Sequence, residues 1–403
     1  MFSMKSINHI VLVSKDATLP EYYGPYNSKY TSTPNIDELA AKGTVFKRHY
    51  TAAPSTAMAF YAMFTGKYPY DSGHSHYVEV EPYEGETLFD ILDKQGYECH
   101  LMWSRNYIIK AEIFSKCFGK NTIHHESMYF NQACGANAAY KKENRKRDDV
   151  LTQSTFDTII KEIDTIDYEN KNIFLWIHMP HCIKGRISYG DDIDVFDNLI
   201  GELRKRFGDE SLFVTADHGH MNGFNHKVGY GFDVYECATR IPLITPRLEG
   251  KGTIDFVTSN VQLKDIIVER KVTQLPYVVS DSAYYAQMKR RTAIIKGNYY
   301  YIYNKYSKKE ELYDIELDPH QDINLLESFN WSDIDRGCRS DIRQVILYPY
   351  WDNITQIAED MRSVLNSFWK RGPWLFELRQ RIKMHPILRS ILLLRDKLKK
   401  RKN

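Results

Sequence analysis

The sequence predicts an α/β fold with a mostly parallel central sheet that helices cover on both faces. Short apolar runs of strand length alternate with helical patterns over roughly the first 245 residues, and such alternation is typical of parallel sheets. Residues 290–315 predict a small antiparallel sheet, and the pattern becomes helical and increasingly basic from about residue 331. We therefore expect a main α/β domain over residues 1–285, a small β subdomain over 286–330 and a basic helical extension over 331–403.

The main elements can be placed in order along the chain. The first strand is the apolar run at residues 9–14, and the helix after Thr33 has Pro34 in its first turn and Gly43 just past its end, which are standard helix boundaries. The later elements are a helix at 87–94, strands at 97–103 and 173–178, a helix at 192–206 with apolar residues at helical spacing, and strands at 212–215 and 241–244. Ligands bind beyond the carboxyl ends of the strands in such sheets, so polar residues that directly follow a strand are the candidates for a site.

The charge is unevenly distributed along the chain. The net charge is only +2, from 54 basic and 52 acidic residues. However, residues 368–403 hold 12 of the basic and 2 of the acidic residues, which leaves a net charge of −8 on the rest. The ordinary globular composition excludes a largely disordered chain or a fibrous rod, and the acidic body argues against a nucleic-acid partner because it would repel phosphates.

The basic tail has an apolar stripe that suggests a surface-binding helix. Ile387, Ile391, Leu394 and Leu398 share one helical face, and basic side chains flank it. Such a helix suits an anionic membrane surface, so residues 368–403 are a candidate membrane contact. A packing helix with a solvated charged end is an equally open interpretation.

The sequence contains no segment that predicts export or membrane insertion. It has no run of 18 apolar residues, and the apolar run at 9–13 is too short for a signal peptide. The six cysteines are scattered and form no CxxC pair, which fits a reducing compartment. We expect a cytoplasmic protein that can associate peripherally with the inner face of the membrane.

Three polar positions stand where a sheet of this kind binds ligands. Asp16 follows the first strand, and Asp217 and His218 follow the strand at 212–215; carboxylates and an imidazole at strand ends can share a metal ion, although each alone could serve as a cap or a turn. Ser55 and Thr56 begin an apolar helical segment. A hydroxyl at that place is an N-cap, or a nucleophile if a metal or base lowers its pKa.

Together these residues and their order resemble the alkaline phosphatase/sulfatase superfamily over about residues 8–326. Besides Asp16 and Thr56, the resemblance rests on several spaced motifs, which are Thr33-Pro34-Asn35-Ile36-Asp37, Thr65-Gly66-Lys67-Tyr68-Pro69, Pro180-His181, Asp217-His218-Gly219, His226 and Glu311-Leu312-Tyr313-Asp314. It implies an alkaline phosphatase-like fold and an enzyme that acts on phosphoric or sulfuric esters. It also implies a divalent metal (Zn, Mn, Mg or Ca) held by Asp16, Thr56, Asp217 and His218. Thr56 would be the nucleophile, and His181 and His226 would protonate the leaving group or bind its oxygens.

The sequence departs from a sulfatase at the nucleophile. The sulfatase pattern C/S-x-P-x-R is replaced by Thr56-Ala57-Met58-Ala59-Phe60, and threonine cannot be oxidised to formylglycine. The segment around Thr56 instead resembles the threonine nucleophile of phosphoethanolamine and phosphoglycerol transferases and of nucleotide pyrophosphatases/phosphodiesterases. It implies a metal-dependent phosphotransferase or phosphodiesterase with a phospho-Thr intermediate. A glycan or a lipid-linked molecule is the candidate substrate. A sulfuric ester hydrolase that works without formylglycine, and a non-catalytic binding protein on the same scaffold, are the alternatives.

Overall fold

A computed structural model gives the structure of most of the α/β body and part of the C-terminal region. The described residues are 7–29, 31–72, 83, 85–103, 117–125, 148–179, 193–221, 223–224, 227, 229–282, 290–305, 307–327 and 351–371. Across these segments, no helix combines the length and the apolar character that a membrane crossing requires.

A large sheet forms the centre of the molecule. Within the described residues it has eight strands in the order β10-β2-β9-β7-β1-β6-β4-β5. Their bounds are β1 His9–Lys15, β2 Thr44–Phe46, β4 Glu98–Trp103, β5 Ile123–His124, β6 Ile173–Met179, β7 Leu212–Ala216, β9 Leu243–Thr245 and β10 Thr253–Ile254. Strand β9 runs antiparallel to β2 and β7, whereas the other neighbouring pairs are parallel. The predicted mostly parallel central sheet is confirmed.

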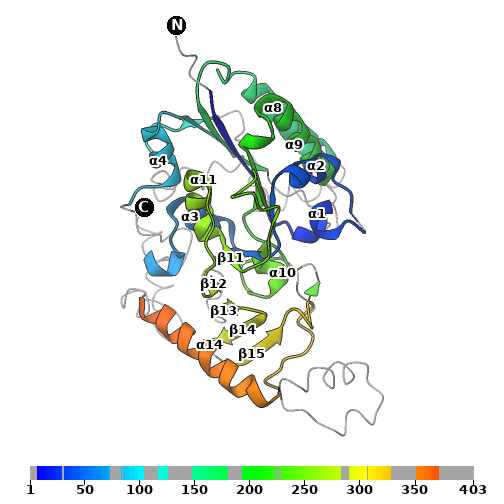
Figure 1. Ribbon diagram of the computed structural model, residues 1–403, viewed down its shortest axis with the longest axis vertical. Helices are drawn as coiled ribbons and strands as arrows, with labels where there is room; N and C mark the ends of the chain where they lie inside the picture. Colours follow the sequence, from blue (N-terminus) through cyan, green and yellow to red (C-terminus); the bar gives the residue numbers. More distant parts are fainter. Residues whose placement is uncertain are drawn as a thin grey trace, which may run out of the picture.

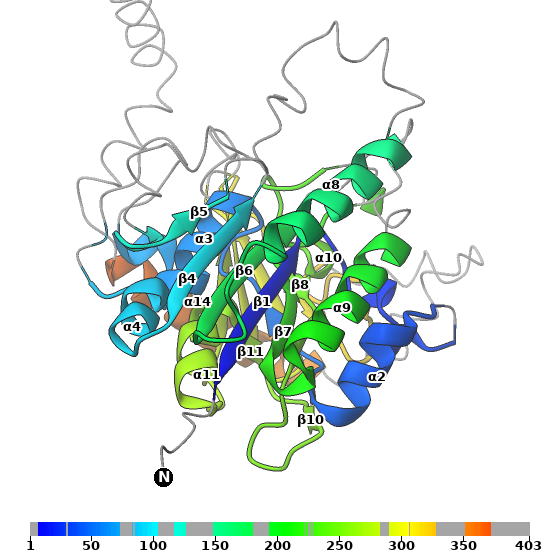
Figure 2. The same ribbon diagram turned by 90° about the horizontal axis from the view of Figure 1, so that it is seen from above.

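Helices cover both faces of this sheet, as Figure 2 shows. One face carries α2 (Pro34–Lys42), α8 (Asp148–Ile163) and α9 (Ile193–Phe207), and the other carries α3 (Thr56–Thr65), α4 (Leu88–Lys94) and α11 (Leu263–Glu269). Successive side chains of a strand point to opposite faces. In β1, Ile10 and Leu12 therefore pack with the α3 side, and Val11 and Val13 pack with the α9 side.

The strand predicted at 241–244 is in fact divided in two by Pro242. Its first part, β8 (Arg240–Ile241), joins β3 (His49–Tyr50) and β11 (Thr258–Ser259) in a separate sheet, and its second part is β9 of the central sheet. Proline has no N–H to donate to a strand ladder, so the chain changes sheets at this residue. The shorter connecting helices are η1 Pro20–Tyr22, α1 Gly24–Asn27, η2 Pro69–Ser72, η4 Asp209–Ser211, α10 Glu236–Thr239 and η6 Asn260–Gln262.

The small antiparallel sheet predicted over residues 290–315 is present, and it begins earlier than predicted, at Val278. It consists of β12 Val278–Asp281, β13 Arg291–Lys296, β14 Tyr299–Asn304 and β15 Glu310–Asp314, in that order. The long helix α14 (Trp351–Arg371) lies along it in Figure 1. Its apolar face, which includes Leu365 and Phe368, packs on Tyr301 and Leu312 of the sheet.

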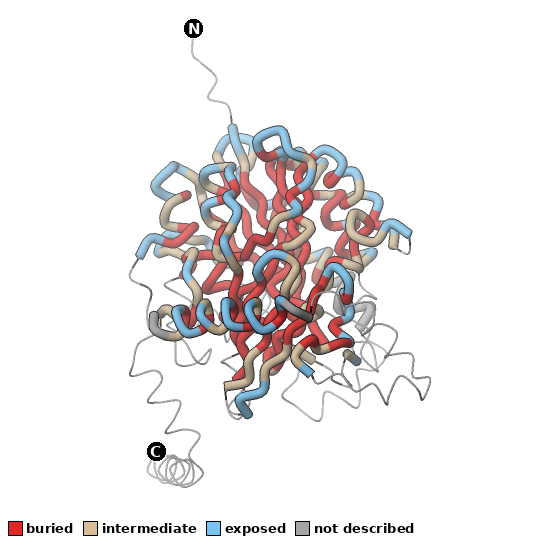
Figure 3. Tube along the Cα trace, turned by 60° about the horizontal axis from the view of Figure 1, so that its bottom comes forward, coloured by how far each residue is buried: buried red, intermediate tan, exposed pale blue. Residues whose placement is uncertain are grey.

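This packing bears on the basic tail. Phe368 is 1% exposed, so the chain up to the end of α14 is part of the folded body. Figure 3 shows that buried residues fill the interior and that α14 presents an exposed outer side. Most of the proposed membrane segment 368–403, including its apolar stripe, lies outside the described residues.

Candidate active site

The register of the central sheet brings two acidic residues to the same edge. Strands β1 and β7 are parallel neighbours in which Lys15 pairs with Ala216. The next residue of each strand is Asp16 or Asp217, so both carboxylates lie at the carboxyl end of the sheet. The side chains of Asp16 and Asp217 are completely buried there.

The turn after β1 is bonded directly to the segment after β7. The amide of Ala17 donates to Asp217 Oδ1 at 3.1 Å, and the amide of Thr18 donates to the carbonyl of His218 at 2.9 Å. Ala17 has a φ of 50°, a left-handed conformation that costs a non-glycine residue roughly 1–2 kcal/mol. These two hydrogen bonds hold the turn in that conformation.

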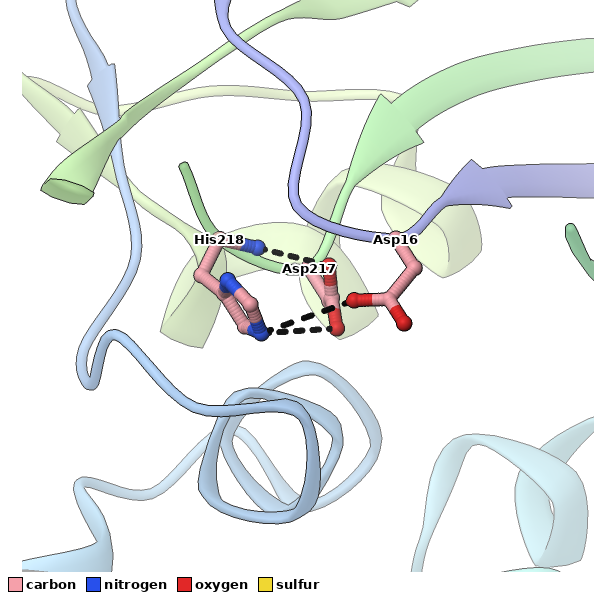
Figure 4. A group of neighbouring side chains, drawn as sticks. All are labelled: Asp16, Asp217 and His218. Atoms are coloured by element: carbon pink, nitrogen blue, oxygen red, sulfur yellow. Dashed lines mark hydrogen bonds and ion pairs between the residues drawn. The ribbon is translucent and has the colours of Figure 1, made fainter. Parts of the chain in front are cut away.

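The imidazole of His218 has a defined tautomer. Its Nδ1 lies 2.8 Å from the carbonyl oxygen of Gly219, and because a carbonyl can only accept, Nδ1 carries the proton of the neutral ring. In this neutral form the lone pair is on Nε2. That atom lies 3.7 Å from Asp16 Oδ1 and 3.4 Å from Asp217 Oδ2, as Figure 4 shows.

Thr56 lies at the first turn of α3, directly against this cluster. Ser55 is the N-cap residue by position, but its side chain makes no capping hydrogen bond. The Thr56 hydroxyl lies 3.1 Å from His218 Nε2, and it is the donor of this hydrogen bond when the His218 ring is neutral. The sequence-predicted group of Asp16, Thr56, Asp217 and His218 is thus brought together.

The residues present fit a divalent cation. Among the described residues, Asp16, Asp217 and His218 form the one group of three or more His, Cys, Asp or Glu side chains whose ligand atoms all lie within 4.8 Å of one another. Asp217 Oδ2 is buried and accepts no hydrogen bond from the described chain. Burial raises the pKa of Asp217 to about 6, and the nearby Asp16 carboxylate adds to the increase. Two buried carboxylates beside a nitrogen lone pair call for a compensating positive charge, and mixed oxygen and nitrogen donors suit Zn²⁺ or Mn²⁺ as well as harder ions.

The other histidines of this region differ in where they lie. His181 and His226 lie outside the described residues, so their predicted roles stay predictions. His178 packs in the aromatic core, where its ring meets Phe60 edge-on at 4.7 Å, and His220 Nε2 lies 3.1 Å from the Tyr22 hydroxyl.

Sequence reasoning missed Tyr230. Its ring lies 4.3 Å from the His218 ring, between ring centroids, and so covers part of that imidazole. It stands in the sequence Gly229-Tyr230-Gly231, which carries no motif that distinguishes it from any other surface turn.

Comparison with known proteins identifies the fold and the domain. The family model described as Sulfatase matches residues 8–182. The chain is 21% identical over 473 aligned positions to the Escherichia coli (strain K12) protein named "Uncharacterized sulfatase YidJ", a match that covers 93% of this chain and 92% of that protein.

Two solved structures show the same fold. A structure described as a 2-O GAG sulfatase superposes with a TM-score of 0.62 at 16% identity and covers 89% of this chain and 94% of that one. The phosphonate monoester hydrolase of Agrobacterium radiobacter superposes with a TM-score of 0.60 at 13% identity and covers 90% and 96% of the two chains.

The expected enzyme class and superfamily are therefore confirmed at the level of phosphoric or sulfuric esters. The chain thus has a sulfatase-family domain over residues 8–182, and it shares its fold with solved structures of a sulfatase and of a phosphonate monoester hydrolase.

Proposed function

We propose that the chain is a metal-dependent hydrolase or transferase that uses Thr56 as its nucleophile on a phosphate-type ester. The observation that carries this proposal is the position of the Thr56 hydroxyl, 3.1 Å from His218 Nε2 and beside two buried carboxylates. A threonine that served only as a helix cap would have no need of these neighbours.

The helix itself favours an anionic substrate at Thr56. Helix α3 has ten residues, and the N–H groups of its first turn present a partial positive charge. A phosphoryl group that approaches the hydroxyl would meet this end of the helix. The helix is also fixed in place, because all ten of its residues are buried.

Asp16, Asp217, His218 and Thr56 would hold the cation. A bound divalent cation supplies the positive charge that lowers the pKa of a ligating hydroxyl and stabilises charge on the transferred group. The protein's contribution is the fixed geometry. The bond from Nδ1 to Gly219 orients the His218 ring, and the amides of Ala17 and His218 orient Asp217.

The proposed chemistry proceeds in two displacement steps. In the first, Thr56 Oγ gives up its proton and forms a bond to phosphorus while the bond from phosphorus to the ester oxygen breaks, and the leaving alcohol takes up a proton. In the second, water or an acceptor alcohol forms the new bond to phosphorus, and the Thr56 oxygen leaves and regains its proton. His181 and His226 are the candidates to exchange these protons.

Sulfuric ester hydrolysis is the second candidate, because the matching family model is that of sulfatases. A panel of aryl phosphate monoester, phosphate diester, phosphonate and sulfate ester substrates separates the two. We expect turnover of at least one phosphorus ester. Turnover of the sulfate ester alone would establish the second candidate and refute the first.

The identity of the natural substrate is part of the proposal. A glycan or lipid-linked ester is our candidate, and the fold similarity to a 2-O GAG sulfatase supports the inclusion of sugar esters in the panel. A membrane-linked substrate would also give the basic tail a role. Because α14 ends at Arg371, flotation with anionic vesicles should compare the full chain with a chain that lacks residues 372–403. Equal flotation would reject a membrane role for the tail.

Variants of the nucleophile test the central role. Thr56→Ala should abolish turnover, whereas Thr56→Ser should retain part of it because a hydroxyl remains. Ser55→Ala is the matched control, since it removes the neighbouring hydroxyl, whose side chain makes no capping bond. Retained activity in Thr56→Ala would refute the assignment.

A further inference from the structure

A group of largely buried charged side chains joins the C-terminal sheet to the segment that follows the metal cluster. Arg291 of β13 lies 2.9 Å from Asp233 through Nη1 and forms an ion pair with Glu311 of β15 through Nη2. Glu311 Oε2 also accepts hydrogen bonds from the hydroxyls of Tyr235 at 2.7 Å and Tyr313 at 3.0 Å. Two strands of the small sheet thus bind residues 233–235 through ion pairs and hydrogen bonds.

These contacts lie in a region of low solvent access. The side chains of Arg291, Asp233 and Glu311 are 8%, 2% and 19% exposed. The guanidinium also lies over the Tyr235 ring, 4.7 Å from its centroid. Charge-assisted bonds between buried groups are strong, and the loss of one partner leaves the other charge uncompensated. These contacts therefore hold residues 233–235 against the small sheet.

Residues 235–239 in turn support the segment that carries His218. The amide of Gly219 donates to the carbonyl of Ala238 at 3.0 Å, and that of His220 donates to the carbonyl of Cys237 at 2.9 Å. A Cβ on Gly219 would lie 2.2 Å from the Cys237 oxygen, so the two backbones are as close as they can be.

A second connection runs through Tyr230. The amide of Met221 donates to the carbonyl of Gly229 at 2.8 Å, and the next residue, Tyr230, lies against the His218 ring. A shift of residues 229–235 would therefore reach the imidazole both through the backbone and through this ring.

We propose that Arg291 and Glu311 are positioning residues for the metal site, acting through residues 233–239 on His218. The inference rests on the proposed function, because it assumes that His218 holds a cation. It gives a role to the Glu311-Leu312-Tyr313-Asp314 motif, which stands more than 90 residues after His218 in the sequence. Loss of a group bonded directly to a metal ligand commonly lowers metal affinity by about 10–100-fold. Glu311 acts through further residues, so we expect an effect at the low end of this range.

The chain offers a matched control one residue away. Glu310 is the neighbour of Glu311 in β15, so its side chain points to the opposite face of the sheet. There it forms an ion pair with Arg362 of α14, with both carboxylate oxygens 2.9 Å from Nε. Glu310→Gln removes an ion pair of the same sheet without a contact to residues 233–239 among those described.

The experiment compares Glu311→Gln and Glu310→Gln in the full chain. Affinity for Zn²⁺ and for Mn²⁺ is measured by competition with a chelator, and amide hydrogen exchange is followed in the metal-free protein. We expect Glu311→Gln to lower metal affinity about tenfold and to speed exchange at Gly219 and His220. Glu310→Gln should leave both within about twofold of the parent.

The outcomes separate the inference from the proposed function. Equal effects of the two variants on exchange and affinity would overturn the positioning role, whatever the activity. If the parent binds neither ion, the metal-dependent function fails, and exchange at Gly219 and His220 still decides whether Glu311 supports the segment. If Glu311→Gln does not fold, Tyr235→Phe takes its place, because it removes only the hydroxyl that donates to Glu311. It should change exchange and metal affinity in the same direction but by less. No effect on either measurement would overturn the positioning role.

Discussion

Gly219 is the position at which a single methyl group should disturb the site most. In Gly219→Ala the added Cβ would stand 2.2 Å from the carbonyl oxygen of Cys237 and 3.1 Å from its carbonyl carbon. Both neighbours are backbone atoms, so no side-chain rotation relieves the contact. The segments 219–220 and 237–238 must separate by about 1 Å to restore an ordinary contact distance.

The loss of stability in Gly219→Ala follows from the contacts that are broken when the two segments move apart. Two backbone hydrogen bonds, of 3.0 and 2.9 Å, join these segments, and each contributes about 1 kcal/mol. The strain of an extra carbon in a packed region adds about 1–3 kcal/mol. We therefore expect Gly219→Ala to lower the free energy of unfolding by about 3–5 kcal/mol.

Urea unfolding of the metal-free protein measures this cost, and Gly208→Ala is the control. Gly208 has a φ of 77° with no heavy atom within 4 Å of an added Cβ, so only backbone strain of about 1–2 kcal/mol applies there. In the metal-binding assay, Gly219→Ala should also lose affinity, because His218 is the preceding residue. A loss of stability no larger than that of Gly208→Ala would refute the close-approach reasoning.

Three further expectations concern the site and its support. Asp217→Asn should lower metal affinity by about 100-fold or more, measured by chelator competition, because it removes a buried charge that two backbone amides orient; unchanged affinity would exclude Asp217 as a ligand. Burial lowers the pKa of His49 to about 3, so on acidification the unfolded chain takes up this proton before the folded protein does. The free energy of unfolding should therefore fall as the pH drops below about 6.5, by about 2 kcal/mol at pH 5. Urea titrations at pH 7 and pH 5 should show a weaker pH dependence in His49→Gln, and an identical dependence would contradict the assignment. Phe60 meets Trp103, Trp176 and His178 edge-on at 4.7–5.0 Å, so Phe60→Ala should cost about 3–5 kcal/mol of stability, and a loss below about 1 kcal/mol in the same titration would show that this cluster packs loosely.

The sequence contained enough information to place the ends of the two key strands. Once β1 and β7 are taken as parallel neighbours, Asp16 and Asp217 must meet at one edge of the sheet, and the structure shows this register. The start of α3 at Thr56 follows from the apolar helical segment after it. These features depend on local periodicity and on strand direction, which a single sequence reveals.

Other features depend on which distant segments meet, and no local pattern encodes that. Tyr230 contacts His218 only because its loop folds back, and Arg291 reaches Asp233 across 58 positions. The division of the strand at 241–244 could have been anticipated, since Pro242 interrupts it. The packing of α14 on the small sheet required the structure, because an amphipathic helix does not specify its partner.

The central claim is that Thr56 is the nucleophile for phosphoryl transfer in a metal-dependent site. Its most direct test is mass spectrometric mapping of the metal-loaded protein after a brief incubation with an aryl phosphate diester and rapid acid quenching. We predict a phosphoryl group on Thr56, absent from Asp217→Asn and from Thr56→Ala. A phosphoryl group on Ser55, or steady turnover by Thr56→Ala with no label at Thr56 in the parent, would contradict the account.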